Sequence, residues 1–435
     1  MNPPVLPPRL LGDWLAWIET LHPRSIELGL DRVRCVAHAM GVTSLPCVVV
    51  TVAGTNGKGS SVAMLEAAFA AGGYRTAAYT SPHLLRYNER VRIDGVDASD
   101  DALCAAFERV EQARGDVSLS YFEFGTLAAL DLITRARPDV ALLEVGMGGR
   151  LDAVNIIDPD VAMVTSIGRD HMEWLGNTRE EIAREKAGIF RAGVPAVCGD
   201  ADPPQSLLDA ARAVGAPLYL RGRDYGCVID DRAERCWHGP RGARLALRPL
   251  ALAGEFQYEN AASVLMVLDL LADRLPSSPA RLAGGLATAR NPGRFQHLPA
   301  DARGVQRVVD VAHNADGARA LAAALAASPC AGVTRLVFGV LGDKDVDAMV
   351  SAMAAVAEDW YLAAPKAARA AAPGRVSARV RALIARANVR DCADVAAAWE
   401  QALDEALPGD RVVGFGSFYT VGEILAREQA TGARV

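Results

Sequence analysis

The sequence lacks the features that identify several common classes of protein. Its eight cysteines include no C-x-x-C pair, so neither a zinc site nor a disulfide framework is expected. Its 46 basic side chains do not outnumber its 52 acidic ones, and the two signs are interspersed, which argues against a nucleic-acid partner. The longest apolar runs have only the length of a strand, so no membrane span is expected.

The N-terminal segment, residues 1–9, is rich in proline and has no apolar stretch of the kind found in a signal peptide. Scattered cysteines in a chain of this size are typical of reduced thiols. These two features together predict a soluble, cytoplasmic protein. The 435 residues, of which 51% are hydrophobic, suffice for two domains with sizeable cores.

An alternation of apolar runs and helical patterns predicts an α/β fold. Strands are expected at residues 48–52, 74–80, 140–145, 161–167, 307–311, 336–340, 360–363 and 411–415, and helices at 14–21, 30–40, 60–71 and 261–271. A break that contains proline, glycine and arginine, at residues 291–296, separates the two series of strands. We therefore predict a P-loop-type parallel-sheet ATPase domain over residues 1–293 and a smaller Rossmann-like α/β domain over residues 294–435.

The first strand runs into a glycine-rich turn around which the rest of the chain is organised. Gly54, Gly57 and Gly59 follow the strand, Lys58 stands between the last two, and a helix is expected from Ser60 onward. In such a turn the backbone N–H groups and the helix N-terminus point toward phosphate oxygens, and the lysine reaches the outer phosphates.

This turn departs from the standard G-x-x-x-x-G-K-[ST] pattern. Val52 replaces the first glycine and Gly59 replaces the hydroxyl residue, which comes one place later at Ser60. The alternative is a glycine-rich turn that binds nothing. Glycines alone do not explain a lysine between them at the start of a helix, so we predict a nucleoside triphosphate site.

Three more polar residues stand at or just past the ends of predicted strands, namely Ser81, Glu144 and His171. In open parallel α/β sheets this edge is where ligands bind. An acid in a buried strand is costly unless a cation offsets it, which favours Glu144 as a metal-binding acid. The alternative is a core glutamate paired with an arginine such as Arg150. A lone histidine after a strand is more often structural, and only its polar neighbours at this edge favour a role for His171.

Two other patterns have ordinary explanations. The glycine cluster at residues 146–149 resembles a dinucleotide fingerprint, but the third glycine would fall at position 151, which is leucine, and this disfavours an oxidoreductase. Lys186 ends a helix that Thr178 and Glu181 open as a possible capping box. A lysine near a helix C-terminus ordinarily complements the helix dipole.

With these residues in hand, the sequence resembles the folylpolyglutamate synthase/dihydrofolate synthase branch of the Mur ligase superfamily. The resemblance extends from about residue 28 to residue 423 and rests on A-G-T-N-G-K-G-S (53–60), T-S-P-H (80–83), L-E-V-G-M-G-G-R-L-D (143–152), D-H with L-G (170–176), E-K-A-G (185–188), N-P-G-R (291–294) and D-V-A-H-N (310–314). The family's variant of the phosphate loop has a glycine after the lysine, which explains the displaced hydroxyl. The family usually has proline where Ala315 stands, a difference that affects the rigidity of that turn.

The resemblance implies an ATP-dependent amide ligase. ATP phosphorylates a folate-like carboxylate to an acyl phosphate, which the α-amine of L-glutamate attacks with release of phosphate. The implied acceptors are dihydropteroate and tetrahydrofolate, used by one bifunctional enzyme, and the aromatic segment at residues 120–124 is compatible with the flat pterin ring. ATP as co-substrate, two Mg²⁺ ions as cofactors and a monomeric state are also implied.

The resemblance also implies roles for residues at matching positions. ATP would be bound by Thr55, Asn56, Gly57, Lys58, Gly59, Ser60, Asn260, Arg294 and Asp310. The metal ligands would be Ser81, Glu144 and His171, and the catalytic residues Lys58, His171, Lys186 and His313. The pterin would be bound by Ile26, Glu27, Leu28, Ser120, Tyr121, Phe122, Glu123, Leu151, Asp152 and Ala153.

Lys186 matches a lysine that the family carboxylates on its side-chain nitrogen. A free ammonium there would repel magnesium, whereas the carboxylated side chain is an anion, and CO₂ adds only to the deprotonated amine. Arg294 and Asp310 lie near or beyond the predicted domain boundary. We therefore expect them to reach ATP only when the domains close, which would exclude water from the acyl phosphate.

Three alternatives to the bifunctional ligase remain at this point. A single-activity folylpolyglutamate synthase would use one acceptor only. Another Mur-type ligase, acting on a UDP-linked cell-wall precursor, would need an extra N-terminal domain, for which the segment before residue 48 is too short. A switch that hydrolyses ATP without ligation is disfavoured by the separate C-terminal α/β domain with its own His313 and Asn314.

Overall fold

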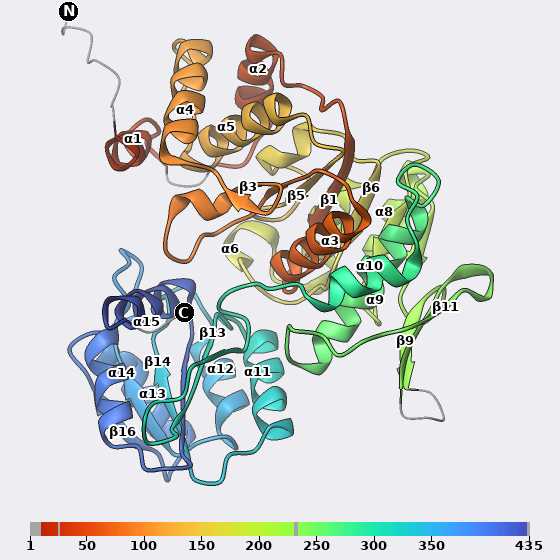
Figure 1. The fold of residues 1–435 in the computed structure, drawn as a ribbon. Coiled ribbons are helices and arrows are strands. Elements are labelled where there is room, and N and C mark those ends of the chain that lie inside the picture. Colours follow the sequence, from red (N-terminus) through yellow and green to blue (C-terminus); the bar gives the residue numbers. More distant parts are fainter. Residues whose placement is uncertain (1–9, 25–26, 230–233, 433–435) are drawn as a thin grey trace, which may run out of the picture.

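The structure is a computed structural model of the chain and describes residues 10–24, 27–229 and 234–432. It contains two α/β units, a larger one in the N-terminal part of the chain and a smaller one in the C-terminal part (Figure 1). The predicted α/β class, with a large parallel sheet followed by a smaller one, is confirmed. Within the described ranges, no helix combines the length and the apolar character that crossing a membrane requires.

The N-terminal sheet has eight strands in the order β4-β3-β2-β5-β1-β6-β7-β8. They are β1 (Val48–Ala53), β2 (Thr76–Tyr79), β3 (Val91–Ile93), β4 (Val96–Asp97), β5 (Val140–Glu144), β6 (Val161–Val164), β7 (Ala196–Cys198) and β8 (Leu218–Leu220). All are parallel except β3 and β4, which form an antiparallel edge. Every residue of β1 and β5 is buried, as expected for central strands covered on both faces.

Helices cover both faces of this sheet. They are α1 (Leu11–Ile18), α2 (Asp31–Met40), α3 (Lys58–Gly72), α4 (Asp100–Arg114), α5 (Tyr121–Ala136), α6 (Met172–Leu175), α7 (Arg179–Lys186), α8 (Gln205–Val214), α9 (Glu255–Leu270) and α10 (Pro279–Ala287), with short 3-10 turns η1 (Tyr87–Arg90), η2 (Ala153–Ile156), η3 (Ala187–Ile189) and η4 (Pro240–Gly242). Because side chains alternate along β1, Val50 and Val52 pack with α3 and α9, whereas Val49 packs with α1, α2, α4 and α5.

A small antiparallel sheet follows β8 and consists of β9 (Gly226–Ile229), β10 (Arg235–His238) and β11 (Arg244–Ala246). It packs on α9 through Trp237, whose indole N–H donates to the carbonyl of Ala262 at 3.0 Å. This sheet therefore supports the helix that carries Asn260.

The C-terminal sheet has six strands in the order β12-β13-β17-β14-β15-β16. They are β12 (Gln296–Leu298), β13 (Gln306–Asp310), β14 (Thr334–Phe338), β15 (Asp359–Leu362), β16 (Asn388–Asp391) and β17 (Arg411–Phe415). All pairs are parallel except that of β12 with β13. On one face pack α11 (Ala315–Ala327), α12 (Val346–Met353) and α13 (Pro373–Leu383), and on the other α14 (Val395–Asp404) and α15 (Phe418–Ala430).

Most predicted elements occur, with their ends shifted by a few residues. The strand expected at residues 411–415 is confirmed as β17. The helix expected at 261–271 starts earlier, at Glu255, so Asn260 lies inside α9 and not before it. The helix expected at 14–21 is shifted to Leu11–Ile18. Strands β12 and β16 were not predicted, because each lies at a sheet edge and buries few side chains.

Candidate functional site

A cleft of about 320 Å³ lies where the carboxyl ends of strands from both sheets face each other. The turn after β1 and the loops after β2, β5 and β6 line it from the N-terminal unit, and the turn after β13 and the start of α15 line it from the C-terminal unit. All residues predicted to serve ATP, metal or catalysis line this cleft: Thr55, Asn56, Gly57, Lys58, Gly59, Ser60, Ser81, Glu144, His171, Lys186, Asn260, Arg294, Asp310 and His313.

The turn after β1 packs closely against α9. Gly57 has a φ of +89°, and a Cβ at this position would lie 2.6 Å from Oδ1 of Asn260, so only glycine fits. Lys58 is the first residue of α3, and its Nζ donates to the carbonyl of Gly54 at 3.0 Å. Burial lowers the pKa of Lys58, whereas Glu144 opposes the change. The lysine is thus folded back over its own loop.

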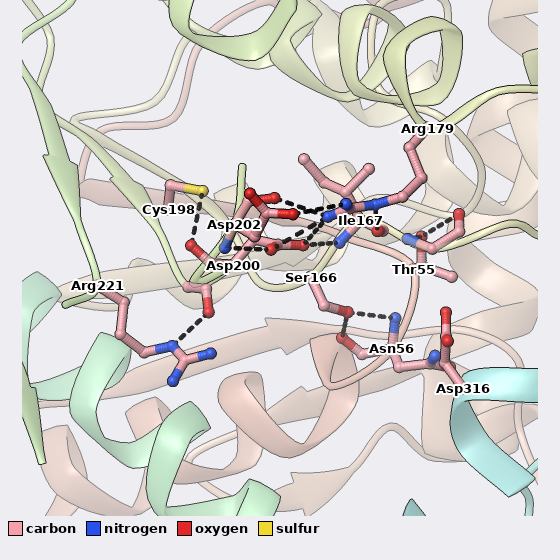
Figure 2. A network of polar contacts seen from close by, with 12 residues as sticks. Thr55, Asn56, Ser166, Ile167, Arg179, Cys198, Asp200, Asp202, Arg221 and Asp316 are labelled. Atoms are coloured by element: carbon pink, nitrogen blue, oxygen red, sulfur yellow. Dashed lines mark hydrogen bonds and ion pairs between the residues drawn. The ribbon is translucent and has the colours of Figure 1, made fainter. Parts of the chain in front are cut away.

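The loop after β6 is hydrogen-bonded to the same turn (Figure 2). The backbone N–H of Gly168 donates to Oγ1 of Thr55 at 2.9 Å, and that of Asn56 donates to Oγ of Ser166 at 3.1 Å. Thr165 returns a hydrogen bond from its Oγ1 to the carbonyl of Asn56 at 2.6 Å. These hydrogen bonds hold the backbone of the turn in place.

Asp200, which follows β7, supports this loop in turn (Figure 2). Its Oδ2 accepts the backbone N–H of Ile167 at 2.8 Å and lies 3.2 Å from Nη2 of Arg179. Arg179 also donates from Nε to the carbonyl of Ile167 at 2.9 Å. The loop after β6 is therefore held through both the backbone N–H and the backbone carbonyl of Ile167.

Glu144 ends β5 with only 4% of its surface exposed. The backbone N–H of Ser81 donates to its Oε2 at 3.2 Å. Burial raises the pKa of Glu144, while Lys58 and Arg294 act in the opposite direction. The alternative pairing with Arg150 is wrong, because that arginine forms its ion pair with a glutamate of α7.

The donor groups at this edge suit a divalent cation. Burial lowers the pKa of His171 to about 4, so its imidazole is neutral at physiological pH and offers a lone pair. A hydroxyl and a carboxylate, from Ser81 and Glu144, are the oxygen ligands that Mg²⁺ prefers. Across the described residues no cluster of three His, Cys, Asp or Glu side chains is preformed for a metal. A cation here would therefore share its coordination with ligand oxygens and water.

Lys186, the last residue of α7, is buried with 3% of its surface exposed. Burial and the neighbouring Lys58 lower its pKa to about 7. A substantial fraction of the side chain is therefore a neutral amine at physiological pH, which is the nucleophilic form. The helix opens with the predicted capping box of Thr178 and Glu181, which is confirmed.

The C-terminal unit contributes two side chains of opposite charge, the half-buried Arg294 and the buried Asp310. The guanidinium of Arg294 lies 4.9 Å from the ring centroid of Phe418. Burial lowers the pKa of Arg294, and Asp310 and Glu144 oppose this. Asp310 is fixed by two backbone N–H groups, those of Phe295 and Ala312, each at 2.7 Å. These two hydrogen bonds fix its carboxylate at the end of β13.

Sequence reasoning missed Asp170, which lines the cleft, and its ion-pair partner Lys344. Asp170 had no assigned role although it precedes His171, and Lys344 gave no signal because its partner is 174 positions away. Nζ of Lys344 lies 2.5 Å from Oδ1 of Asp170. Burial would raise the pKa of Asp170, but His313, His171 and Lys344 hold it well below its usual range.

The segments predicted to bind the pterin meet one another beside the cleft. Arg32 bridges two of them, with Nη1 2.8 Å from Oε1 of Glu27 and Nη2 2.9 Å from Oε1 of Glu123. The backbone N–H of Gly29 reaches the carbonyl of Leu151 at 3.4 Å, which adds the third segment. The described members of the predicted set do not line the cleft defined above. Ile26 lies outside the described residues.

Several of these side chains have structural partners. Ser120 and Glu123 form the capping box that opens α5. Asp152 accepts the backbone N–H groups of Met147 at 2.8 Å and Val154 at 3.0 Å, and burial raises its pKa to about 6. The remaining members are Leu28, Tyr121, Phe122 and Ala153, of which Phe122 stacks on Tyr79 with 6.1 Å between the ring centroids. Their roles toward a pterin stay predictions.

Known proteins match this chain over nearly all of its length. Residues 52–268 match the Mur ligase middle domain, and residues 293–418 match the Mur ligase glutamate ligase domain. The chain is 41% identical to the dihydrofolate synthase/folylpolyglutamate synthase of Escherichia coli, over 95% of this chain and 94% of the relative, and 36% identical to that of Haemophilus influenzae, over 96% and 97%.

Solved structures give the same result. The structure of E. coli FolC in complex with DHPP and ADP superposes with a TM-score of 0.90 and covers 98% of this chain and 99% of that one, at 41% identity. A crystal structure of a bifunctional folylpolyglutamate synthase/dihydrofolate synthase with Mn, AMPPNP and L-glutamate bound has a TM-score of 0.87, covers 97% of this chain and 98% of that one, and is 41% identical.

Proposed function

The chain belongs to the dihydrofolate synthase/folylpolyglutamate synthase family of Mur ligases, which are ATP-dependent ligases, and on this premise we propose how its cleft performs the reaction. The enzyme joins L-glutamate to dihydropteroate, giving dihydrofolate, and adds further glutamates to tetrahydrofolate. In both cases the acceptor carboxylate is first phosphorylated to an acyl phosphate. The α-amine of glutamate then attacks that carbon, and phosphate leaves.

The observation that carries the proposal is the meeting of charges from both units around Gly59. A Cβ built on this glycine would lie 3.8 Å from Oε2 of Glu144 and 3.9 Å from Nη2 of Arg294. Lys58, the preceding residue, is half-buried, and its charge interacts with those of Glu144 and Arg294. Phosphoryl transfer places negative charge on the transferred group, and fixed cations at this point stabilise it. A glycine turn that binds nothing would not gather two half-buried cations.

The residues that line the cleft have separate roles in this reaction. Thr55, Asn56, Gly57, Gly59 and Ser60 present the turn and the start of α3 to the phosphates, and Asn260 and Asp310 contact the remainder of the nucleotide. Lys58 exchanges the carbonyl of Gly54 for a phosphate oxygen. Arg294 approaches the transferred phosphoryl group from the C-terminal side. His313 faces the attacking glutamate.

Ser81, Glu144 and neutral His171 would hold Mg²⁺, of which we propose two ions. When bound, magnesium neutralises charge on the phosphate oxygens. Glu144 is kept in place by the backbone N–H of Ser81. Lys186, with a pKa near 7, is suited to take up CO₂ on its amine and become an anion next to the metal. We further propose that the enzyme acts as a monomer.

The deciding experiment measures glutamate-dependent ADP release from ATP and Mg²⁺, with dihydropteroate and separately with tetrahydrofolate as the acceptor. Release with both acceptors, matched by amide product, is the expected result. Turnover with one acceptor alone would restrict the enzyme to a single step. Absence of stimulation by either acceptor would refute the folate assignment. ADP release that needs no glutamate would favour the nucleotide-dependent switch.

A further inference from the structure

Asp170 lies where the two units touch. Within its own unit, the backbone N–H of His171 donates to its Oδ1 at 2.9 Å, and three side chains of the C-terminal unit contact the same carboxylate. Nζ of Lys344 is 2.5 Å from Oδ1, Nδ2 of Asn314 is 3.1 Å from Oδ2, and Nε2 of His313 is 3.3 Å from Oδ2. The side chains of Asp170 and Lys344 are 8% and 6% exposed. An ion pair this well buried, and further hydrogen-bonded, is much less screened than a surface pair.

The side chain of Asn314 ties the same contact to the phosphate loop. Its Nδ2 donates to Asp170 and to Oδ1 of Asn56, the latter at 3.0 Å. Its Oδ1 accepts from Nδ2 of Asn56 at 3.1 Å and from the backbone N–H of Gly317 at 2.9 Å. All four hydrogen-bonding positions of this amide are therefore used. Two of these hydrogen bonds join the side-chain amides of Asn56 and Asn314 to each other, and so link the two units.

On the N-terminal side of this contact, hydrogen bonds hold the loop that carries Asp170. Asp170 follows Gly168 on the loop after β6, and that loop is bonded to Thr55 and braced by Asp200 (Figure 2). The phosphate turn and the loop that carries Asp170 are thus joined by hydrogen bonds. A movement of the C-terminal unit away from it must break the contacts of Lys344 and Asn314 together.

These contacts also separate two cavities. Behind Asp170 lies a second cavity of about 710 Å³, which Lys344, Asp343 and Asp345 line together with the loop after β6. Asp170 and His171 line both this cavity and the reaction cleft, as do Ser166, Asp200 and Asp316. Separation of Lys344 from Asp170 would therefore open a route for water from the second cavity into the cleft.

We propose that Lys344, Asn314 and Asp170 form an interdomain latch that holds the C-terminal unit over the cleft and keeps water from the acyl phosphate. The proposal rests on the proposed ligase function. In ligation, the glutamate amine forms a C–N bond, the C–O bond to phosphate breaks, and one amine proton leaves with the phosphate. If water attacks in its place, the same C–O bond breaks, the carboxylic acid is regenerated, and ATP has been hydrolysed without an amide product.

The latch therefore determines how many ADP molecules are released for each amide formed. Lys344 and Asn314 are positioning residues here, acting through Asp170. The test measures this ratio for the wild type and for Lys344→Met at saturating L-glutamate, with dihydropteroate as the acceptor. The matched control is Lys366→Met, the same change at an exposed lysine of the same unit.

We expect a ratio close to one for the wild type and the control, and a ratio raised at least about threefold for Lys344→Met. Lys344→Arg, which keeps the charge, should restore a ratio near one. Asp170→Asn combined with Lys344→Met should raise the ratio no further than the stronger single variant, because both remove the same pair. Lys344→Gln replaces Lys344→Met if the latter does not fold.

A ratio that stays at one in Lys344→Met and Lys344→Gln, while the rate of ligation falls, would overturn the latch. A ratio that rises at low glutamate and returns to one at saturation would also overturn it, since Lys344 would then contact glutamate itself. Failure of the proposed function is distinguishable from both results, because the wild type would then form no amide at all.

Discussion

The side-chain amide of Asn291 lies against the Cα atom of Gly59. A Cβ built on Gly59 would be 3.2 Å from Nδ2 of Asn291 and would point between Glu144 and Arg294. Most phosphate loops have a serine or threonine directly after the lysine. In this chain that position faces the connection between the two units, so the contact explains why glycine stands there and the hydroxyl comes one residue later, at Ser60.

Gly59→Ser, which restores the standard pattern, should therefore weaken and not improve the nucleotide site. The added side chain displaces Asn291 and the two charged groups around it. We expect kcat/KM for ATP to fall by about tenfold to a hundredfold, the scale on which small displacements at a reacting centre act. Steady-state kinetics measures this. Gly284→Ser is the control, because nothing lies within 4 Å of a Cβ on that glycine of α10.

Arg294→Ala should lose far more ligase activity than stability. Burial of the guanidinium is costly, as its lowered pKa indicates, and Asp310 keeps its two backbone N–H donors when Arg294 is removed, so the loss of folding free energy should be small. Its charge at the transferred phosphoryl group should be worth about a hundredfold or more in kcat. Single-turnover kinetics and urea unfolding are to be compared on the same preparation. A loss of unfolding free energy in proportion to the lost activity would contradict the assigned role.

Glu144→Gln should weaken the response to magnesium while the fold persists. Burial already raises the pKa of Glu144, so a neutral isostere should be tolerated in the apo protein, with a melting temperature at least equal to that of the wild type. Activity should fall by about a hundredfold or more, with a higher magnesium requirement. Titration of ADP release with Mg²⁺ tests this. Unchanged magnesium dependence would exclude Glu144 as a ligand.

The carboxylation of Lys186 should depend on pH with a defined sign. Its pKa is lowered to about 7 from the usual 10.5, so the neutral amine predominates above pH 7 and the ammonium below it. CO₂ adds only to the neutral amine, and the modified fraction should therefore fall as the pH is lowered from about 8 to about 6. Labelled bicarbonate, followed by mass spectrometry of gently handled protein, measures this fraction. Lys366, an exposed lysine, should take up no stable label. A bare amine at Lys186 at every pH would reject the modification.

The sequence predicted those parts of the site that depend on order along the chain. Lys58, Ser81 and Glu144 each follow an apolar run, and the rule that ligands bind at the carboxyl ends of parallel strands was enough to bring them together. The capping box of α7 was predicted for the same reason, since Thr178 and Glu181 are three residues apart.

The parts that were missed depend on contacts between distant segments. No local pattern relates Asp170 to Lys344, or Asn56 to Asn314, because each pair is formed only when the two sheets face each other. The early start of α9 was missed because Gly254 provides no side-chain cap, so the polar residues at its beginning resembled a loop. The alternative pairing of Glu144 with Arg150 could not be ruled out from the sequence, because the contact between Arg150 and Glu185 forms only when two segments 35 positions apart meet.

The amide pair of Asn56 and Asn314 has a consequence for how such genes can recombine. Each asparagine satisfies the other, and an exchange of C-terminal halves between relatives would leave a buried amide unpaired wherever the incoming half lacks its match. An exchange that keeps both asparagines leaves the pair intact. By contrast, the segments predicted to bind the pterin all lie before residue 154, within one half of the chain, and a substitution there lies away from this amide pair.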